Sequence, residues 1–313
     1  MLLSVSPHSH KKGSITRIMW VVFLSLLPSG IAGVFIFGPR ALWIILACIL
    51  SAIGTEAIIL LLRRKKISVI DGSAALTGLL LAYNLPSGLP IWMACVGSFF
   101  AIAIAKQAFG GLGRNIFNPA LAGRAFLLIA WPRYMVTFNK PFFYPDSVTC
   151  ATPLAVLKEG KAETIYQMGL NYLDLFLGNR AGCIGEVCIA FLLLGALFLL
   201  WRRIISWHIP LTFIFTLGIL TWFWGGSGIG QADVLFYILS GGVILGAFFM
   251  ATDYVTSPLT RKGQLIFGFG CGLLTFIIRK WGGYPEGVSF AILMMNAVVP
   301  LLDRFCRPRI YGS

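Results

Sequence analysis

Hydrophobic runs long enough to cross a bilayer recur along the whole chain, and short polar segments separate them. A transmembrane helix needs about 20 consecutive, mostly apolar residues. Lipid offers the backbone no hydrogen-bond partners, so such runs are expected to be helical. The pattern predicts about ten transmembrane helices, with approximate limits 17–37, 41–62, 71–86, 89–108, 115–131, 183–201, 208–224, 233–250, 263–279 and 286–303.

The composition is typical of a membrane protein. Of 313 residues, 58% are hydrophobic and 12% are charged, and the mean hydropathy is +0.86. A soluble domain carries about 25% charged residues. We therefore predict an all-α, polytopic membrane protein in which residues 1–313 form a single membrane domain surrounded by the lipid bilayer.

The formal net charge of +14 reflects membrane topology, and it does not indicate a nucleic-acid partner. The basic residues gather at the ends of the predicted spans, as in residues 63–66, and no basic-aromatic module interrupts the hydrophobic runs. Lys and Arg are enriched on the cytoplasmic side of membrane proteins. More of them fall inside if both termini are cytoplasmic, so we predict that topology.

This topology places residues 132–182 outside the cytoplasm. They form the one long polar stretch between predicted spans, and long loops in compact proteins tend to be functional. The halves on either side, at about 17–131 and 183–303, are predicted to be inverted five-helix repeats, because an odd number of spans reverses the second copy. Polar residues at the ends of the third and eighth spans predict broken helices around a site near the membrane midplane.

The long loop contains the string DSVTCATPL at residues 146–154. An Asp-x-x-Thr-x-Ala-Thr string resembles the site at which a flavin transferase esterifies FMN onto a threonine, and the acceptor here is Thr152. A threonine hydroxyl is a weak nucleophile, so this modification requires a separate enzyme and an activated donor. The alternative interpretation is an ordinary turn, in which Asp146 caps a helix and Pro153 starts one.

Residues 110–120 place glycines before a span that has Asn-Pro-Ala in its first turns. A helix N-terminus presents free N–H groups and the positive end of the helix dipole. Asn115 and Asn118 are therefore candidates to hydrogen-bond the carbonyl groups of a flavin ring. The alternative is a capped, glycine-hinged loop. A phosphate-binding loop is not indicated, because no Lys-Ser/Thr pair follows the glycines.

Glu56 lies within the second predicted span, where a charge is energetically expensive. Intramembrane carboxylates are candidates for an ion path. The alternative for Glu56 is an ion pair with Arg63 or Arg64, about two turns away. The seven cysteines form no C-x-x-C pair, so the sequence predicts no metal site.

Five strings together resemble the NqrB/RnfD family, which comprises the membrane flavoprotein subunits of the Na⁺-pumping NADH:quinone and Rnf complexes. The strings occur in the family's order: DGSAALTGLLLAYNLP (71–86), GGLGRNIFNPALAG (110–123), DSVTCATPL (146–154), ATDYVTSP (251–258) and GGYPEGVSFAILMMNAVVPL (282–301). Cys150 stands where the family commonly has Gly, and Tyr254 stands where Pro is expected. The short segment before the first span favours the Rnf branch.

The resemblance implies a urea-transporter-like fold and a redox role in an ion-translocating ferredoxin:NAD⁺ oxidoreductase, coupled to Na⁺ or H⁺ movement across the bacterial inner membrane. It implies covalent FMN on the outer side at Thr152, within a site that includes Asp146, Thr149, Ala151, Pro153 and Leu154. It also implies a noncovalent riboflavin among the helices, nearer the cytoplasm. The implied partners are the A, B, C, E and G subunits of the Rnf complex and a flavin transferase.

Arg124 and Lys106 are candidates to stabilise anionic flavin states, a hypothesis that rests on their charge alone. Three other functions remain open at this point. The chain resembles the B subunit of Na⁺-translocating NADH:quinone reductase, its fold suits a solute transporter or channel, and a structural membrane scaffold would need neither flavin nor flux. Bound flavin separates the electron carriers from the transporter and the scaffold.

Overall fold

The computed structural model describes residues 15–64, 69–142, 149–159, 169–226, 230, 232–284 and 286–306. The described chain is almost entirely helical, as the sequence predicts. The first half contains α1 (Ile15–Phe37), α2 (Pro39–Leu62), the 3₁₀ turn η1 (Val69–Asp71), α3 (Ser73–Tyr83), α4 (Ile91–Ile102), the π-helical turn η2 (Ala103–Gln107) and α5 (Pro119–Ala130).

The connection between the halves contains α6 (Pro132–Met135), β1 (Phe138–Asn139), β2 (Thr149–Cys150), α7 (Pro153–Lys158) and α8 (Tyr172–Leu177). The second half contains α9 (Ile189–Trp201), α10 (His208–Trp224), α11 (Val234–Leu239), α12 (Val243–Leu245), the π-helical turn η4 (Gly246–Met250), α13 (Arg261–Trp281) and α14 (Val288–Phe305).

Four helices are long and apolar enough to cross a membrane: α1, α2, α13 and α14. Five shorter apolar helices lie among them, and the multi-pass character predicted from the sequence is confirmed. The total of ten spans stays a prediction. The sixth predicted span is wrong at its start, because residues 183–188 are not helical and α9 begins only at Ile189.

The eighth predicted span is broken, and two glycines explain the break. Gly241 and Gly242 have φ values of 65° and 69°, a left-handed conformation in which a side chain would be strained. They end α11 and restart the chain as α12. The carbonyl groups left at the end of α11 are satisfied by the buried Arg279 of α13, which donates to Ser240 O at 2.9 Å and also to Tyr237 O.

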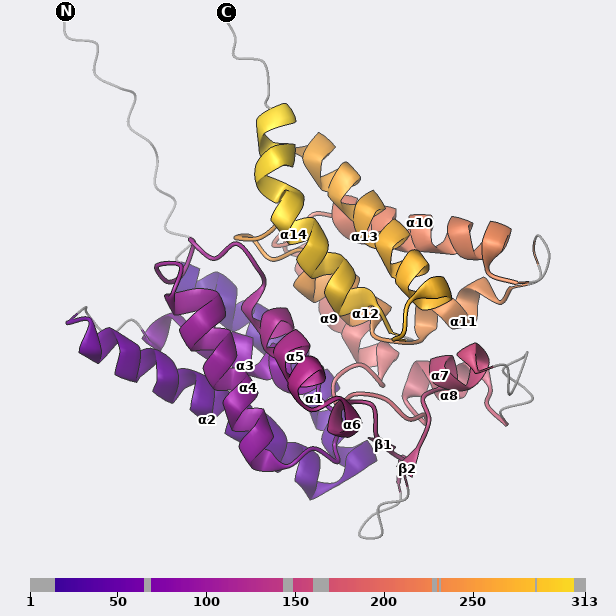
Figure 1. Cartoon of the computed structure of the whole chain (residues 1–313), viewed down its shortest axis with the longest axis horizontal. Coiled ribbons are helices and arrows are strands. Elements are labelled where there is room, and N and C mark those ends of the chain that lie inside the picture. Colours follow the sequence, from indigo (N-terminus) through magenta and orange to yellow (C-terminus); the bar gives the residue numbers. More distant parts are fainter. Residues whose placement is uncertain are drawn as a thin grey trace, which may run out of the picture.

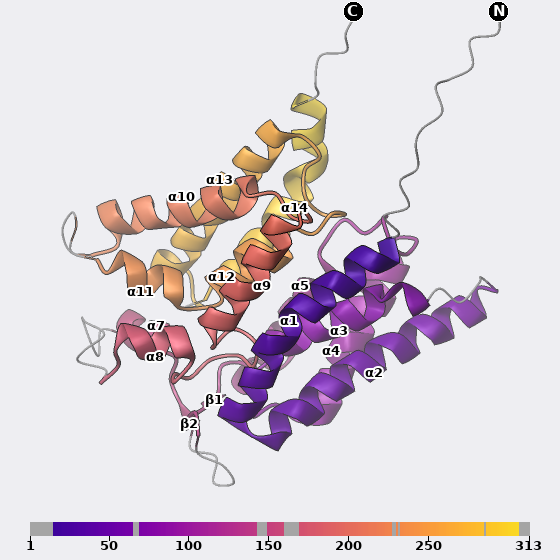
Figure 2. The same cartoon turned by 180° about the vertical axis from the view of Figure 1, so that it is seen from behind.

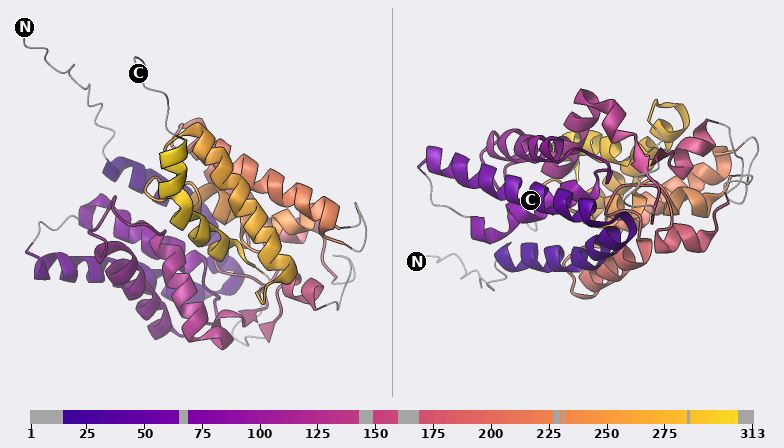
Figure 3. Two further views of the ribbon diagram at one scale, coloured as in Figure 1. Left: turned by 45° about the horizontal axis from the view of Figure 1, so that its top comes forward. Right: turned by 90° about the horizontal axis from the view of Figure 1, so that it is seen from below.

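The two halves lie side by side, with residues 15–130 on one side of the molecule and residues 189–305 on the other (Figure 3). Corresponding helices meet at their boundary, since α1 packs against α9 and α5 packs against α14. Within the halves, α2 packs against α4 as α10 packs against α13. The start of α1 and the end of α14 lie at one end of the molecule, and β1, β2, α7 and α8 lie at the opposite end (Figures 1 and 2).

Tyr83, at the end of α3, lies where the two halves meet. Its hydroxyl donates to Leu26 O of α1 at 2.7 Å, and its carbonyl accepts from Gly185 N of the second half at 3.1 Å. Ser29 Oγ of α1 also donates to Gly185 O at 2.7 Å. The backbone of the second half approaches so closely that a Cβ on Gly185 would lie 2.0 Å from Cγ of Tyr83. Gly30 is equally restricted, with a Cβ only 2.2 Å from the Tyr83 hydroxyl.

The connecting segment is held against the second half by a small apolar cluster. Leu154 of α7, Leu175 of α8 and Phe236 of α11 are buried together. Tyr172 Oη also donates to Asp233 Oδ2 at 2.5 Å. These contacts hold α7 against the helices of the second half, and they therefore also position Thr152, the residue that precedes α7.

Gly185→Ala is expected to lower the free energy of unfolding by about 1–3 kcal/mol, because the added methyl group overlaps the Tyr83 ring. Gly54→Ala is the matched control. No described atom would lie within 4 Å of its Cβ, and Ala is favoured over Gly in a helix by about 0.5–1 kcal/mol. Thermal unfolding of the detergent-solubilised protein measures both, and an equal effect of the two substitutions would contradict the packing argument.

Candidate functional site

Thr152 lies between β2 and α7, where it caps the helix. Its Oγ1 accepts a hydrogen bond from Ala155 N at 3.3 Å, and Pro153 is the first helical residue. The helix start that Thr-Pro indicates in the sequence is therefore present. Thr152 is buried, at 6% exposure, and it also lines a cavity.

This cavity, called the loop cavity below, has a volume of about 250 Å³. It lies between α5, α14 and the connecting segment, and its walls include Thr152, Ala151, Arg124, Glu286, Tyr284 and Phe290. The rings of Tyr284 and Phe290 are stacked, with centroids 5.9 Å apart. Ligand pockets usually measure about 300–1,000 Å³, so the loop cavity approaches the size needed for an aromatic cofactor.

The other predicted residues of the string have different places. Asp146 lies outside the described residues. Thr149 is exposed in β2, and Ala151 lines the loop cavity beside the acceptor threonine. Pro153 and Leu154 are buried, and they anchor α7 without facing the cavity. Of the described string residues, the structure brings Ala151 and Thr152 to the cavity.

Cys150, the departure from the family's glycine, is half-buried in β2. Burial raises the pKa of its thiol above the ordinary value, and the charge of Lys140 lowers it to a smaller extent. The thiol is therefore protonated at neutral pH. The substitution adds a small neutral side chain next to Ala151, and it adds no thiolate that would compete with Thr152 as a nucleophile.

Arg124 brings a buried positive charge to the loop cavity. Its Nη1 donates to Asn84 Oδ1 at 2.8 Å and to Ser289 Oγ at 3.0 Å, and its Nη2 forms an ion pair with Glu286. Asn84 ends α3, and Ser289 opens α14, so Arg124 connects the two halves. Both members of the ion pair line the cavity.

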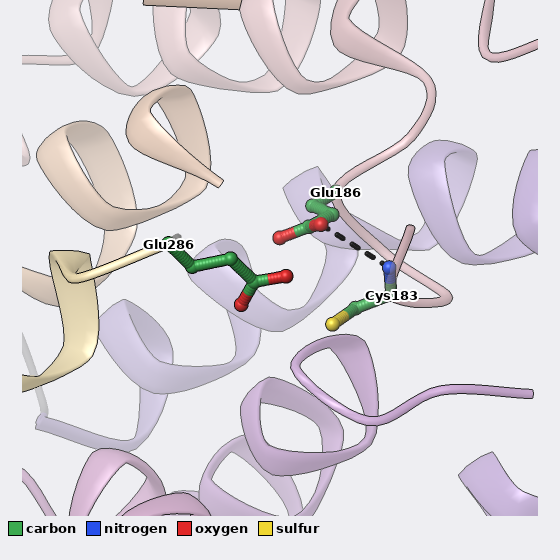
Figure 4. Close-up of side chains that lie close together, drawn as sticks. All are labelled: Cys183, Glu186 and Glu286. Carbon is green, nitrogen blue, oxygen red and sulfur yellow. Dashed lines mark hydrogen bonds between the residues drawn. The ribbon is translucent and has the colours of Figure 1, made fainter. Parts of the chain in front are cut away.

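Glu286 also belongs to a group of donor atoms behind the cavity. Cys183 Sγ and one carboxylate oxygen each from Glu186 and Glu286 lie within 4.8 Å of one another (Figure 4). Glu186 Oε1 accepts a hydrogen bond from Cys183 N at 3.2 Å. One oxygen of each carboxylate is buried without a hydrogen-bond partner among the described residues. By geometry alone, these three side chains are the described residues that could hold a metal ion.

Charge argues against a cation in this group. Arg124, Arg180 and Arg279 surround two carboxylates, so the buried network already carries more positive than negative charge. Arg180 donates to Glu186 O at 3.1 Å, and Arg279 Nε donates to Glu286 O at 3.2 Å. Breaking such a network by removing one partner typically destabilises a protein by about 3–5 kcal/mol. We interpret it as the support that holds Arg124 and Glu286 at the loop cavity.

A second cavity, of about 80 Å³, lies at the other end of α5. Lys106, Asn115 and Asn118, three of the residues that the sequence nominates for a flavin site, line it together, and their contact with a flavin stays a prediction. Asn118 is the N-cap of α5, because its Oδ1 accepts from Ala120 N at 3.1 Å, and its Nδ2 donates to Met250 O. The alternative interpretation of residues 110–120 as a capped loop is therefore correct at the start of α5. A space this small admits a flavin ring only if side chains move.

Lys106 and Glu56 form an ion pair in the interior, with Nζ and Oε1 2.8 Å apart and both side chains 2% exposed. Lys106 also donates to Ser73 Oγ at 2.7 Å, and Gln107 Nε2 donates to Glu56 Oε1 at 2.8 Å. Every charge in this group has a partner, as a low-dielectric interior requires.

The sequence-based partners of Glu56 were wrong. Arg63 instead donates to Gln107 O at 2.8 Å, and Arg64 is exposed beyond the end of α2. The true partner, Lys106, is 50 residues away in the chain. The π-helical turn η2 packs against α2 and places Lys106 beside Glu56, a contact that no local sequence pattern contains.

Sequence reasoning also missed the buried network. Arg180 lies in the predicted outer loop and Arg279 at the end of a predicted span, but both are buried, at 3% and 5% exposure. Both donate hydrogen bonds to carbonyl groups inside the fold. The available signal was weak: glycines lie within three residues of Arg180, Arg279 and Glu286, but no local pattern joins the three charges.

Residues 2–312 match the NQR2, RnfD, RnfE family. The chain is 50% identical over 317 residues to the D subunit of the proton-translocating ferredoxin:NAD(+) oxidoreductase complex of Clostridium ljungdahlii, an alignment that covers 99% of this chain and 96% of the relative. It is 49% identical over 314 residues to the D subunit of the Na(+)-translocating ferredoxin:NAD(+) oxidoreductase complex of Acetobacterium woodii, covering 100% and 95%.

A third relative, the D subunit of the ion-translocating oxidoreductase complex of Stutzerimonas stutzeri, is 43% identical over 334 residues, covering 96% of this chain and 93% of the relative. The family match and these three alignments cover nearly the whole chain. The chain therefore belongs to the NQR2, RnfD, RnfE family.

Proposed function

We propose that this chain is the D subunit of an ion-translocating ferredoxin:NAD⁺ oxidoreductase, the Rnf complex of the bacterial inner membrane. The observation that carries the proposal is its near-full-length identity to relatives of that name. The chain would relay electrons within a redox-driven translocase. Relatives named for protons and for sodium are almost equally identical, at 50% and 49%, so overall identity does not distinguish the coupling ion.

The proposed cofactor is FMN joined covalently to Thr152. The residues fit such a group: Thr152 lines a cavity whose walls also include two stacked aromatic rings, a buried arginine and Glu286, one oxygen of which has no hydrogen-bond partner among the described residues. When bound, a flavin supplies one- or two-electron transfer, and the protein supplies placement and tuning. A covalent tether keeps the flavin at very high effective concentration on a membrane face that has no pool to replace it.

Thr152→Ala is expected to abolish covalent flavin, because it removes the acceptor hydroxyl. In-gel flavin fluorescence of the denatured protein, co-expressed with a flavin transferase, measures this directly. Thr137→Ala is the matched control, since it removes an exposed threonine of the same connecting segment that lies outside the string, and its band should stay fluorescent. A dark wild-type band beside an active transferase would refute the proposal and favour the transporter.

A noncovalent riboflavin is proposed at the second cavity, the one lined by Asn115 and Asn118. Asn118 uses one amide N–H for Met250 O and has another to offer. Lys106 lines the same space, although Glu56 neutralises it. Opening of this cavity is part of the proposal, because about 80 Å³ is too little for three fused rings.

Arg124 and Lys106 are proposed to stabilise anionic flavin at the two cavities. Replacing either with Gln is expected to lower the reduction potential of the nearby flavin, on the order of 50 mV for a factor of about ten in stabilisation of the reduced form. Redox titration of the purified complex measures the shift. The effect of Lys106→Gln should be smaller, because Glu56 already offsets its charge. Unchanged potentials in both variants would remove this role.

Glu56 is proposed as part of the ion path, because an ionisable side chain within a membrane-spanning helix is functional by default. Glu56→Gln should change the Na⁺ or H⁺ dependence of electron transfer by the complex in vesicles. The double variant Glu56→Gln/Lys106→Met removes both charges and controls for an unpaired lysine. If the double variant restores wild-type ion dependence, the pair is structural and Glu56 carries no ion.

The proposed topology has ten spans in two inverted five-helix repeats, with both termini cytoplasmic and Thr152 outside. The equivalent contacts of α1 with α9 and of α5 with α14 support the repeats. Helix α7 and the end of α14 lie at opposite ends of the molecule (Figure 1), which supports placing Thr152 and the C-terminus on opposite sides of the membrane. A membrane-impermeant maleimide added to intact cells should leave Cys306, which follows α14, unlabelled.

The proposed partners are the A, B, C, E and G subunits of the Rnf complex and the flavin transferase that modifies Thr152. The relatives' names describe one subunit of a complex, which supports the membrane partners.

Two alternative functions have specific support. The broken helix between α11 and α12 suits a solute transporter, and the matched family includes the NADH:quinone reductase subunit. Bound flavin excludes the first, and ferredoxin dependence excludes the second.

A further inference from the structure

A third cavity opens at the end of the bundle where α9 finishes and α10 and α13 begin. Its volume is about 680 Å³, and its walls include Arg203, Ser206, Trp207, Tyr254, Arg261 and Gln264. Of the described residues that line it, the charged ones are Arg203 and Arg261, so the cavity carries two positive charges. We call it the basic cavity.

Both arginines face this space with their charge uncompensated. Both are exposed, and neither guanidinium has a hydrogen bond or an ion pair with any residue that the structure describes. Arg203 has a φ of 54°, a left-handed backbone that favours glycine. It follows the end of α9, where its N–H donates to Leu200 O at 2.9 Å. This backbone is unfavourable for arginine, which suggests a use for the side chain.

An apolar groove of about 380 Å³ continues from the basic cavity. It runs along α10 and is lined by apolar side chains only, among them Leu200, Trp207, Leu211 and Phe215. Leu200 and Trp207 line both spaces, so the two are contiguous. Phe215 is 64% exposed and Leu211 is 54% exposed, as expected for a surface that faces lipid tails.

Side-chain contacts join the elements that line the two spaces. The rings of Trp207 and His208 are stacked, with centroids 4.2 Å apart. Ser206 Oγ donates to Gln264 Oε1 at 2.8 Å, which joins the start of α10 to α13. Tyr254 Oη donates to Ile204 O. Trp and Tyr at such a level are typical of the membrane–water interface, where one side of the ring is apolar and the other is wet.

We propose that the basic cavity and the apolar groove together bind one anionic phospholipid, with the phosphate between Arg203 and Arg261 and an acyl chain along α10. The combination of two uncompensated cations and a continuous apolar groove matches an amphiphilic anion. The elements that line the cavity, at the end of α9 and the starts of α10 and α13, lie at the end of the bundle where α14 finishes, the side proposed to be cytoplasmic (Figure 1). Basic pockets on that side attract anionic headgroups.

The test uses the whole complex, delipidated in detergent and titrated with phosphatidylglycerol or phosphatidylcholine while native mass spectrometry counts bound lipid. The wild type should bind phosphatidylglycerol more tightly. Arg203→Gly/Arg261→Gln should weaken that binding roughly 30-fold, to the level of phosphatidylcholine, at about 1 kcal/mol for each basic residue. Arg203→Gly suits the left-handed backbone, so loss of binding would not reflect misfolding.

Two controls separate the headgroup from the tail. Arg133→Gln removes an exposed arginine on α6, near the opposite end, and should leave lipid binding unchanged. Leu211→Trp fills the groove and should weaken both lipids equally. Equal binding of the two lipids by the wild type would overturn the proposal. So would a wild-type complex that binds neither lipid because a neighbouring subunit covers the arginines.

Discussion

Backbone that is not helical, yet buried among membrane-spanning helices, must find its hydrogen-bond partners inside the protein, and this constraint organises the structure. In lipid, an unsatisfied N–H or carbonyl group costs several kcal/mol. The chain unwinds in the interior after α3, before α9 and between α11 and α12. Each break is satisfied across the fold: Ile184 N donates to Leu85 O at 3.0 Å, and Arg279 donates to the carbonyl groups that end α11.

The side chains that satisfy these helix breaks also position the candidate site. Arg279 holds the end of α11 and also donates to the backbone of Glu286, whose carboxylate pairs with Arg124. Arg124 in turn holds Asn84 at the end of α3. The charged side chains that satisfy the breaks therefore meet between the halves, beside the cavity of Thr152. The halves also approach closely at Tyr83, so a cofactor beside the network would meet charged groups that the fold already holds in place.

The two buried charge groups differ in what they offer a cofactor or an ion. The pair of Lys106 and Glu56 is compact and internally satisfied, since Ser73 and Gln107 complete its hydrogen bonds. The arginine network has a surplus of positive charge, and Glu186 and Glu286 each keep one oxygen that has no hydrogen-bond partner among the described residues. The proposed flavin, if it became anionic on reduction, would be stabilised by this second arrangement. The pair of Lys106 and Glu56 would change the charge that it presents to a cofactor only if the two side chains separated.

The sequence alone determined the helical membrane class, the positions of most helices, the long connecting segment and the threonine of interest. Apolar length and the demand for internal backbone hydrogen bonds act locally, so they can be inferred from a run of residues. Tertiary structure decided the partners. Glu56 pairs with a lysine 50 residues away, and Arg124 pairs with a carboxylate 162 residues away. Such contacts depend on how the halves pack, and so do the cavity at Thr152 and the burial of arginines that otherwise look like loop charges.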